Sequence, residues 1–125
     1  MASRLALIAL AGATGTLCRY GLASGVQRWV GAGFPWGTWS VNALGSFLFG
    51  FIWMLGEDRV VISTQARFII LTGFMGAFTT FSTFAFETDA MLREGQWLAA
   101  FGNVTGQTLL GLACVFLGIA LGKWV

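Results

Sequence analysis

Residues 73–87 hold the side chains of this chain that could contact an ion inside a membrane. Gly73 and Gly76 are poor helix formers, and the hydroxyls of Thr79 and Thr80 offer the backbone alternative hydrogen bonds. A helix broken here would free carbonyls that lipid cannot satisfy, and unwound carbonyls at membrane depth favour hard cations such as sodium. The same pattern also fits a continuous helix whose small residues form a packing face.

Two stripes of side chains continue along this segment. Aromatic rings recur on one helix face, at Phe78, Phe81 and Phe84. Polar groups recur on another face, at Thr80, Thr83 and Glu87. Because phenylalanine ring edges are weakly positive, rings beside hydroxyl and amide donors could partly replace the water around a small anion. The alternatives are an aromatic stripe that only contacts core or lipid, and a Glu87 carboxylate at the membrane interface near Arg93.

Two more polar residues stand inside apolar segments. Arg19 lies about 22 Å along a helix from Arg4, at 1.5 Å per residue. It is either a cation that snorkels to the interface or a fixed charge that orients packing or holds an acidic partner or an anion. Asn42, Ser46 and Gly50 form a small, polar ridge at four-residue intervals. The Asn42 amide could bond a neighbouring helix or donate into an aqueous pathway.

The composition indicates an integral membrane protein. The 125 residues are 57% hydrophobic and only 10% charged, too few charges for the surface of a soluble domain. The chain has no histidine, and neither a nucleophile–base pair nor a metal-ligand cluster is visible, so we expect no enzymatic activity. The net charge of +2 is small and the basic residues are scattered, which gives nucleic acid binding no support.

Apolar segments predict an all-α protein with a single transmembrane domain over residues 1–125. The expected spans are residues 5–26, 36–55, 66–92 and 97–121, with the third span broken mid-membrane. The glycine pairs Gly102/Gly106 and Gly118/Gly122 predict close helix packing in the fourth span.

The charged flanks specify the orientation in the membrane only weakly. Basic residues on one side are Arg4, Arg59, Arg67 and Lys123, and those on the other side are Arg28 and Arg93. So small a bias would let the chain insert in both orientations. Four small helices also enclose little space, so we expect an oligomer with its pathway at subunit contacts.

Three motifs of this chain belong together. They are Gly73-Phe-Met-Gly76 with Thr79-Thr-Phe-Ser-Thr-Phe84 and then Glu87, Pro35-Trp-Gly-Thr38 with Val41-Asn-Ala-Leu-Gly45, and Gly12-Ala-Thr-Gly15 with Arg19-Tyr20. These motifs resemble those of the Fluc (CrcB-type) fluoride channels. The length and the four-span layout agree, so the resemblance covers nearly the whole chain. It implies an antiparallel, dual-topology homodimer in a bacterial inner membrane, with two fluoride pores and a structural sodium ion at its centre.

The resemblance also implies residue roles. Backbone carbonyls of Gly76 and Thr79 would hold the sodium ion. The fluoride pathway would comprise the amide donor Asn42, the rings of Phe81 and Phe84, and the polar groups Ser82, Thr83 and Glu87. Arg19 would be a structural or vestibule cation. The match thins in the fourth span, where Asn103 and Gln107 are plausible donors without an assigned role.

The implied function is a passive, fluoride-selective channel that exports cytoplasmic fluoride and lowers its toxic concentration. One alternative is a small dual-topology, proton-coupled exporter of cations or drugs. It would need an acidic residue in its cavity, whereas the first span offers Arg19, which repels cations. The other alternative is a non-transporting membrane assembly subunit, which would tolerate Phe81→Ile and Asn42→Asp.

Overall fold

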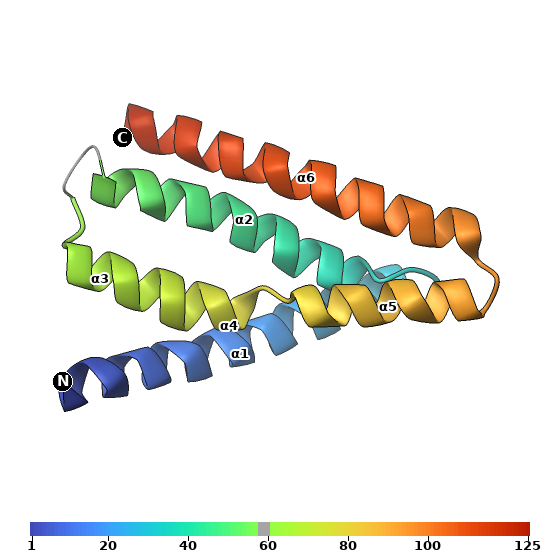
Figure 1. Ribbon diagram of the computed structural model, residues 1–125, viewed down its shortest axis with the longest axis horizontal. Helices are drawn as coiled ribbons and strands as arrows, with labels where there is room; N and C mark the ends of the chain where they lie inside the picture. Colours follow the sequence, from blue (N-terminus) through green and yellow to red (C-terminus); the bar gives the residue numbers. More distant parts are fainter. Residues whose placement is uncertain (58–60) are drawn as a thin grey trace.

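The computed structural model describes residues 1–57 and 61–125, and the regular elements among them are helices (Figure 1). The elements are α1 (Ala2–Val30), α2 (Trp36–Glu57), α3 (Thr64–Phe68), η1 (Ile69–Met75), α4 (Gly76–Phe78), α5 (Phe81–Arg93) and α6 (Trp97–Trp124). Four stretches of the described chain are long and apolar enough to cross a membrane: Ala2–Val30, Trp36–Glu57, Thr64–Arg93 and Trp97–Trp124. The predicted all-α protein with four membrane-length helices is confirmed. Arg59, counted among the basic flanks, lies outside the described residues.

The third stretch, Thr64–Arg93, is composed of four helical pieces. The π-helical piece η1 follows α3 directly and leads into the short α4. Thr79 (φ −84°, ψ 159°) and Thr80 (φ −148°, ψ 109°) are then extended, and α5 begins at Phe81. Gly76 keeps right-handed helical angles (φ −60°, ψ −30°), so the extended residues are the threonines, whose hydroxyls compete for backbone hydrogen bonds.

Helix α2 is the central element of the bundle. It packs along α6 on one side and against α1 on another, while α1 also lies against η1 and α4 (Figure 1). The backbones of α2 and α6 approach closely, since a Cβ built on Gly118 would lie 2.1 Å from the Phe47 carbonyl oxygen. Gly122 likewise faces α2, at the Met54 side chain. Gly102 has open space around it, so the second glycine pair packs as predicted and the first does so only in part.

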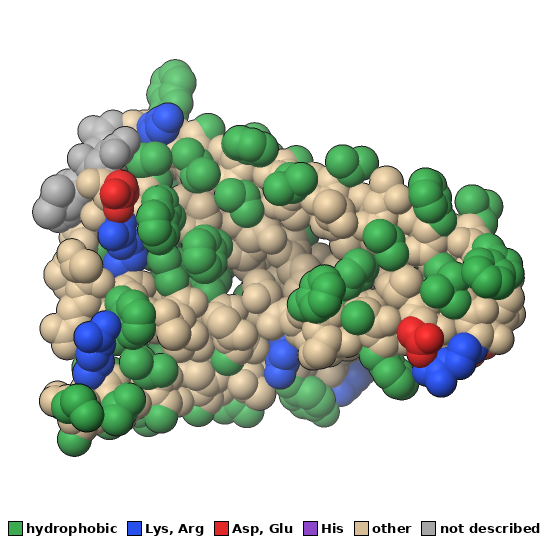
Figure 2. Space-filling model, in the orientation of Figure 1, with side chains coloured by type: hydrophobic (Ala, Val, Ile, Leu, Met, Phe, Trp, Pro, Cys, Tyr) green, Lys and Arg blue, Asp and Glu red, His purple; other side chains and the backbone are tan. Residues whose placement is uncertain are grey.

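The outer surface is apolar. Figure 2 shows hydrophobic side chains spread over the helices, with the visible acidic side chains gathered towards the two ends of the elongated bundle. On α6 the exposed residues include Leu98, Phe101 and Phe116. A lipid bilayer is the solvent in which such a surface is stable.

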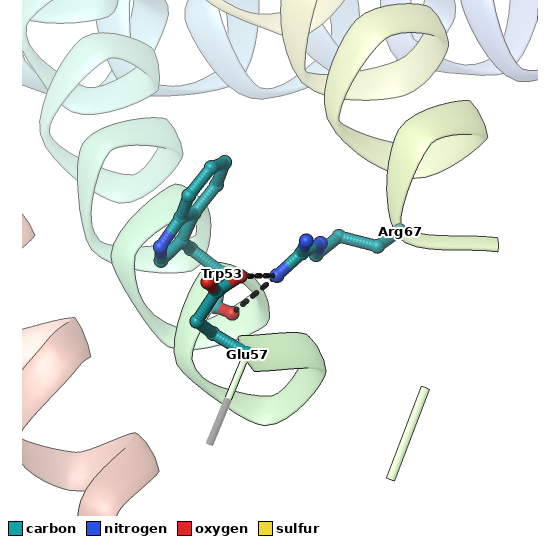
Figure 3. Close-up of polar contacts among 3 residues, drawn as sticks. All are labelled: Trp53, Glu57 and Arg67. Atoms are coloured by element: carbon teal, nitrogen blue, oxygen red, sulfur yellow. Dashed lines mark hydrogen bonds and ion pairs between the residues drawn. The ribbon is translucent and has the colours of Figure 1, made fainter. Parts of the chain in front are cut away.

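The Arg67 side chain joins two helices at one end of the bundle. Arg67, a residue of α3, forms an ion pair with Glu57 at the end of α2 (Figure 3). Its guanidinium also lies 4.7 Å from the centroid of the Trp53 ring, and at 3.5 Å from the Trp53 carbonyl oxygen. Arg67 is therefore inside the third helical stretch and joins its start to α2, across the connection between the two.

The glycine contact between α2 and α6 predicts a stability difference. Gly118→Val should lower the free energy of unfolding by about 1–3 kcal/mol, because added methyl groups would overlap the α2 backbone. Thermal unfolding in detergent micelles measures the change. Gly102→Val, the same substitution in the same helix where space is open, is the control. Equal losses in the two variants would contradict the packing argument.

Candidate functional site

Asn42 of α2 pairs with the extended backbone between α4 and α5. Its Oδ1 accepts a hydrogen bond from the Thr80 N–H at 2.8 Å, and its Nδ2 donates to the Thr80 carbonyl oxygen at 3.2 Å. One side-chain amide thus satisfies both backbone groups of a buried residue. The Thr80 N–H, which a continuous helix would bond internally, therefore has the Asn42 oxygen as its acceptor.

A hydroxyl cluster marks the start of α5. The Thr80 hydroxyl accepts from the Thr83 N–H at 3.2 Å, which caps the helix, and donates to the Thr83 hydroxyl at 2.9 Å. The Ser82 hydroxyl lies 3.4 Å from that of Thr80. Ser82 and Thr83 are exposed, so their hydroxyls are within reach of a ligand beside the helix start.

A cavity of about 350 Å³ opens beside this pairing, between α2, α5 and α6. Its lining includes Asn42, Thr79, Thr80, Phe81, Phe84 and Gln107. The centroids of the Phe81 and Phe84 rings lie 5.6 Å apart, and Phe81 is 79% exposed. The structure therefore brings together the predicted amide donor and both predicted rings, and places the Gln107 side chain beside them.

Glu87 lies apart from that cavity. Its Oε1 accepts a hydrogen bond from the Thr38 hydroxyl at 2.7 Å, while Oε2 is buried without a hydrogen-bond partner among the described residues. Thr38, Thr83 and Glu87 line a second cavity of about 400 Å³. Arg19, half-buried on α1, lines a third cavity of about 300 Å³ that also includes Thr38 and Thr83.

Thr80 lies between these spaces. It lines both the cavity of the phenylalanine rings and the cavity of Arg19. The predicted site residues therefore fall into two groups separated by the first turn of α5. Asn42, Phe81 and Phe84 lie on one side, and Arg19 and Glu87 lie on the other.

Gly76 and Thr79 lie at the two ends of the short α4. In a continuous helix the Thr80 N–H would bond the Gly76 carbonyl oxygen, four residues earlier. Here that N–H is directed to Asn42 instead. The helical ladder therefore ends at Thr79, whose N–H bonds the Met75 carbonyl oxygen at 3.0 Å.

Sequence reasoning assigned no role to Thr38 or Trp39, and left Asn103 without one. The Trp39 Nε1–H donates to Asn103 Oδ1 at 2.7 Å, and Asn103 is fully buried. A signal for Thr38 was present, because it lies four residues before Asn42 and extends the ridge of Asn42 and Ser46 by one turn. Nothing in the local sequence pairs Trp39 with α6.

Together, the fold and these contacts define a small multi-pass helical membrane protein with polar side chains gathered at the interruption of its third span. Residues 6–119 match the family described as CrcB-like protein, Camphor Resistance (CrcB). The chain belongs to this family, as the sequence motifs predict.

Curated relatives are similar over almost their full length. A protein of Nitrosococcus oceani named "Fluoride-specific ion channel FluC" is 60% identical over 123 residues, 98% of each chain. Proteins with the same name from Solidesulfovibrio magneticus and Nitratidesulfovibrio vulgaris are 52% identical over 125 residues, 100% of each chain, and 51% identical over 122 residues, 98% of each chain.

The pairing of Asn42 with Thr80 predicts a stability effect. Asn42→Leu should lower the free energy of unfolding by about 1–3 kcal/mol, because it leaves the buried N–H of Thr80 without an acceptor. Ser40→Ala is the control, since the Ser40 hydroxyl bonds the Trp36 carbonyl oxygen of its own helix. Thermal unfolding in micelles compares the two. A loss no greater than that of Ser40→Ala would contradict the prediction.

Proposed function

We propose that this protein is a fluoride-selective channel through which fluoride leaves the cytoplasm passively. Named relatives at 51–60% identity support the assignment. The observation that carries it is the composition of the 350 Å³ cavity: amide, hydroxyl and phenylalanine side chains line it together, and its lining among the described residues includes no charged side chain. Such donors can replace part of the hydration of a small anion without trapping it, as conduction requires.

The export direction follows from acid–base chemistry and the membrane potential. Hydrogen fluoride is a weak acid that crosses membranes uncharged in acid surroundings and dissociates in the more alkaline cytoplasm. A negative potential inside the cell then drives the anion outward, at about 2.3 kcal/mol per charge per 100 mV. A bacterial inner membrane carries this potential, and we place the channel there.

We further propose that two copies associate in antiparallel orientation. The 350 Å³ cavity is open to the outside, and the Phe81 ring that lines it is 79% exposed. A second copy seated on this face would enclose the pathway and remove the rings from lipid. An inverted copy is compatible with the weak bias of the charged flanks.

A structural sodium ion at the dimer centre is part of the same proposal. Backbone carbonyls of Gly76 and Thr79 would hold it, at the point where the helical ladder of α4 ends. The Asn42 amide favours this use, because it engages the N–H that a continuous helix would direct to the Gly76 carbonyl. Sodium, a hard cation, suits carbonyl oxygen ligands.

Fluoride efflux from liposomes tests the channel function. Purified protein should release fluoride, and Phe81→Ile or Asn42→Asp should slow release on the order of tenfold, equivalent to about 1.4 kcal/mol. The first change removes a ring edge, and the second replaces an amide donor with a group that repels anions when ionised. Phe116→Ile, on the exposed surface of α6, is the matched control and should leave release unchanged. Release no faster than from protein-free liposomes, where a known channel works, would refute the function.

Sodium dependence is tested separately from transport. The melting temperature in micelles should be higher in sodium chloride than in potassium chloride at equal ionic strength. A ligand that binds only the native state stabilises it by about 2.7 kcal/mol at a hundred times its dissociation constant. Identical melting temperatures in the two salts across a wide concentration range would argue against a sodium site.

A further inference from the structure

Three side-chain amides form a continuous hydrogen-bonded chain between α2 and α6. Asn42 Nδ2 donates to Gln107 Oε1 at 2.8 Å, and Gln107 Nε2 donates to Asn103 Oδ1 at 3.0 Å. Asn103 Nδ2 in turn donates to the Thr88 hydroxyl at 2.8 Å, and that hydroxyl donates to the Phe84 carbonyl oxygen, also at 2.8 Å. The chain of amides thus runs from the interruption of the third span to the middle of α5.

Obligate donors fix the direction of this amide chain at both ends. An amide can present either its oxygen or its NH₂ group to a neighbour, but an indole N–H and a backbone N–H can only donate. The Trp39 indole therefore requires the Asn103 oxygen, at 2.7 Å, and the Thr80 N–H requires the Asn42 oxygen, at 2.8 Å. With both oxygens so placed, Gln107 must turn its NH₂ group to Asn103 and its oxygen to Asn42.

Gly106 makes the indole contact possible. A Cβ built on Gly106 would lie 2.2 Å from Cη2 of Trp39, so the ring rests directly on the α6 backbone. This places the indole N–H one turn from Gln107, against Asn103. Gly106, the second glycine of the first pair in α6, therefore accommodates an aromatic ring that orients the amide chain.

The amide chain engages the Asn42 NH₂ group, which is the donor that the proposed channel needs. Both hydrogens of the Asn42 NH₂ group have acceptors here, the Thr80 carbonyl oxygen at 3.2 Å and Gln107 Oε1 at 2.8 Å. Asn42 and Gln107 both line the 350 Å³ cavity beside Phe81 and Phe84. An anion that reaches Asn42 from this cavity must compete with the Gln107 oxygen for an N–H.

We propose, resting on the channel function above, that Gln107 is a positioning residue whose oxygen is a built-in competitor of fluoride at Asn42. Without an anion, the Asn42 N–H donates to the Gln107 oxygen, which orients this N–H in the pathway. An entering anion replaces the Gln107 oxygen as acceptor, and the hydrogen bond to Gln107 forms again when the anion leaves. This exchange weakens fluoride binding by about the contribution of one hydrogen bond. Faster release follows, and conduction depends on release as much as on entry.

Fluoride flux from liposomes, measured over a range of fluoride concentrations, tests the competition. Gln107→Met keeps the length of the side chain and removes its oxygen, so fluoride meets an unoccupied Asn42 N–H. We expect the half-saturating fluoride concentration to fall about three- to tenfold, the range for one hydrogen bond, and the maximal flux to fall with it. Gln65→Met, the same change at an exposed glutamine of α3, should alter neither quantity.

Trp39→Phe provides an independent variant, which leaves the cavity lining intact. Without the indole N–H, Asn103 can turn its NH₂ group to Gln107. The Gln107 oxygen can then accept from Asn103 as well as from Asn42. The half-saturating concentration should fall in this variant too, by a smaller factor. Combining it with Gln107→Met should produce no shift beyond that of Gln107→Met alone, because both changes act through one contact.

The outcomes separate this inference from the channel function itself. A wild-type protein without fluoride flux refutes the channel function. If the wild type conducts, a lower maximal flux with an unchanged or higher half-saturating concentration in Gln107→Met would show a merely structural role or a direct ligand role, and would overturn the competition. If Gln107→Met does not elute as a folded protein, the shift in Trp39→Phe decides in the same way.

Discussion

The structure depends on the hydrogen-bond partners of Thr80, an extended residue between α4 and α5 in the third membrane-length stretch. Where α4 ends and Thr80 is extended, the Thr80 N–H has no helical acceptor, while the Thr80 carbonyl begins α5 from the N-cap position. The side chain of Asn42 supplies both an acceptor and a donor. These two hydrogen bonds join α2 to the segment between α4 and α5 at the position of Asn42.

Small residues allow that pair to form. A Cβ on Gly45, one turn after Asn42, would lie 2.2 Å from the Thr79 methyl group, so α2 can approach the interruption only with glycine there. Gly106 gives the Trp39 ring similar access to α6. In a bilayer no difference in solvent drives helices together, so close packing and interhelical hydrogen bonds must hold them. In this protein, close packing at Gly45 and Gly106 occurs beside the interhelical hydrogen bonds of Asn42 and Trp39.

The start of α5 divides the polar residues by environment. On one side, neutral amides and aromatic rings face an open cavity whose lining, within residues 1–57 and 61–125, holds no charged side chain. On the other side, the Glu87 carboxylate accepts from Thr38, and Arg19 borders a separate cavity. Neutral donors can release an anion readily, whereas a full charge would hold or exclude it. Thr80 lines a cavity on each side and is therefore shared by the two groups of polar residues.

The sequence by itself determined the four membrane-length helices, since long apolar stretches have few alternatives in lipid, and its motifs identified the family. It also marked Asn42 and the residues around Thr79, because amides, hydroxyls and glycines are conspicuous in apolar segments. Only the tertiary structure decided which amide meets which partner. The contacts of Trp39 with Asn103 and of Asn42 with Gln107 join residues more than 60 positions apart. No local periodicity encodes them, because they depend on how closely α2 and α6 approach.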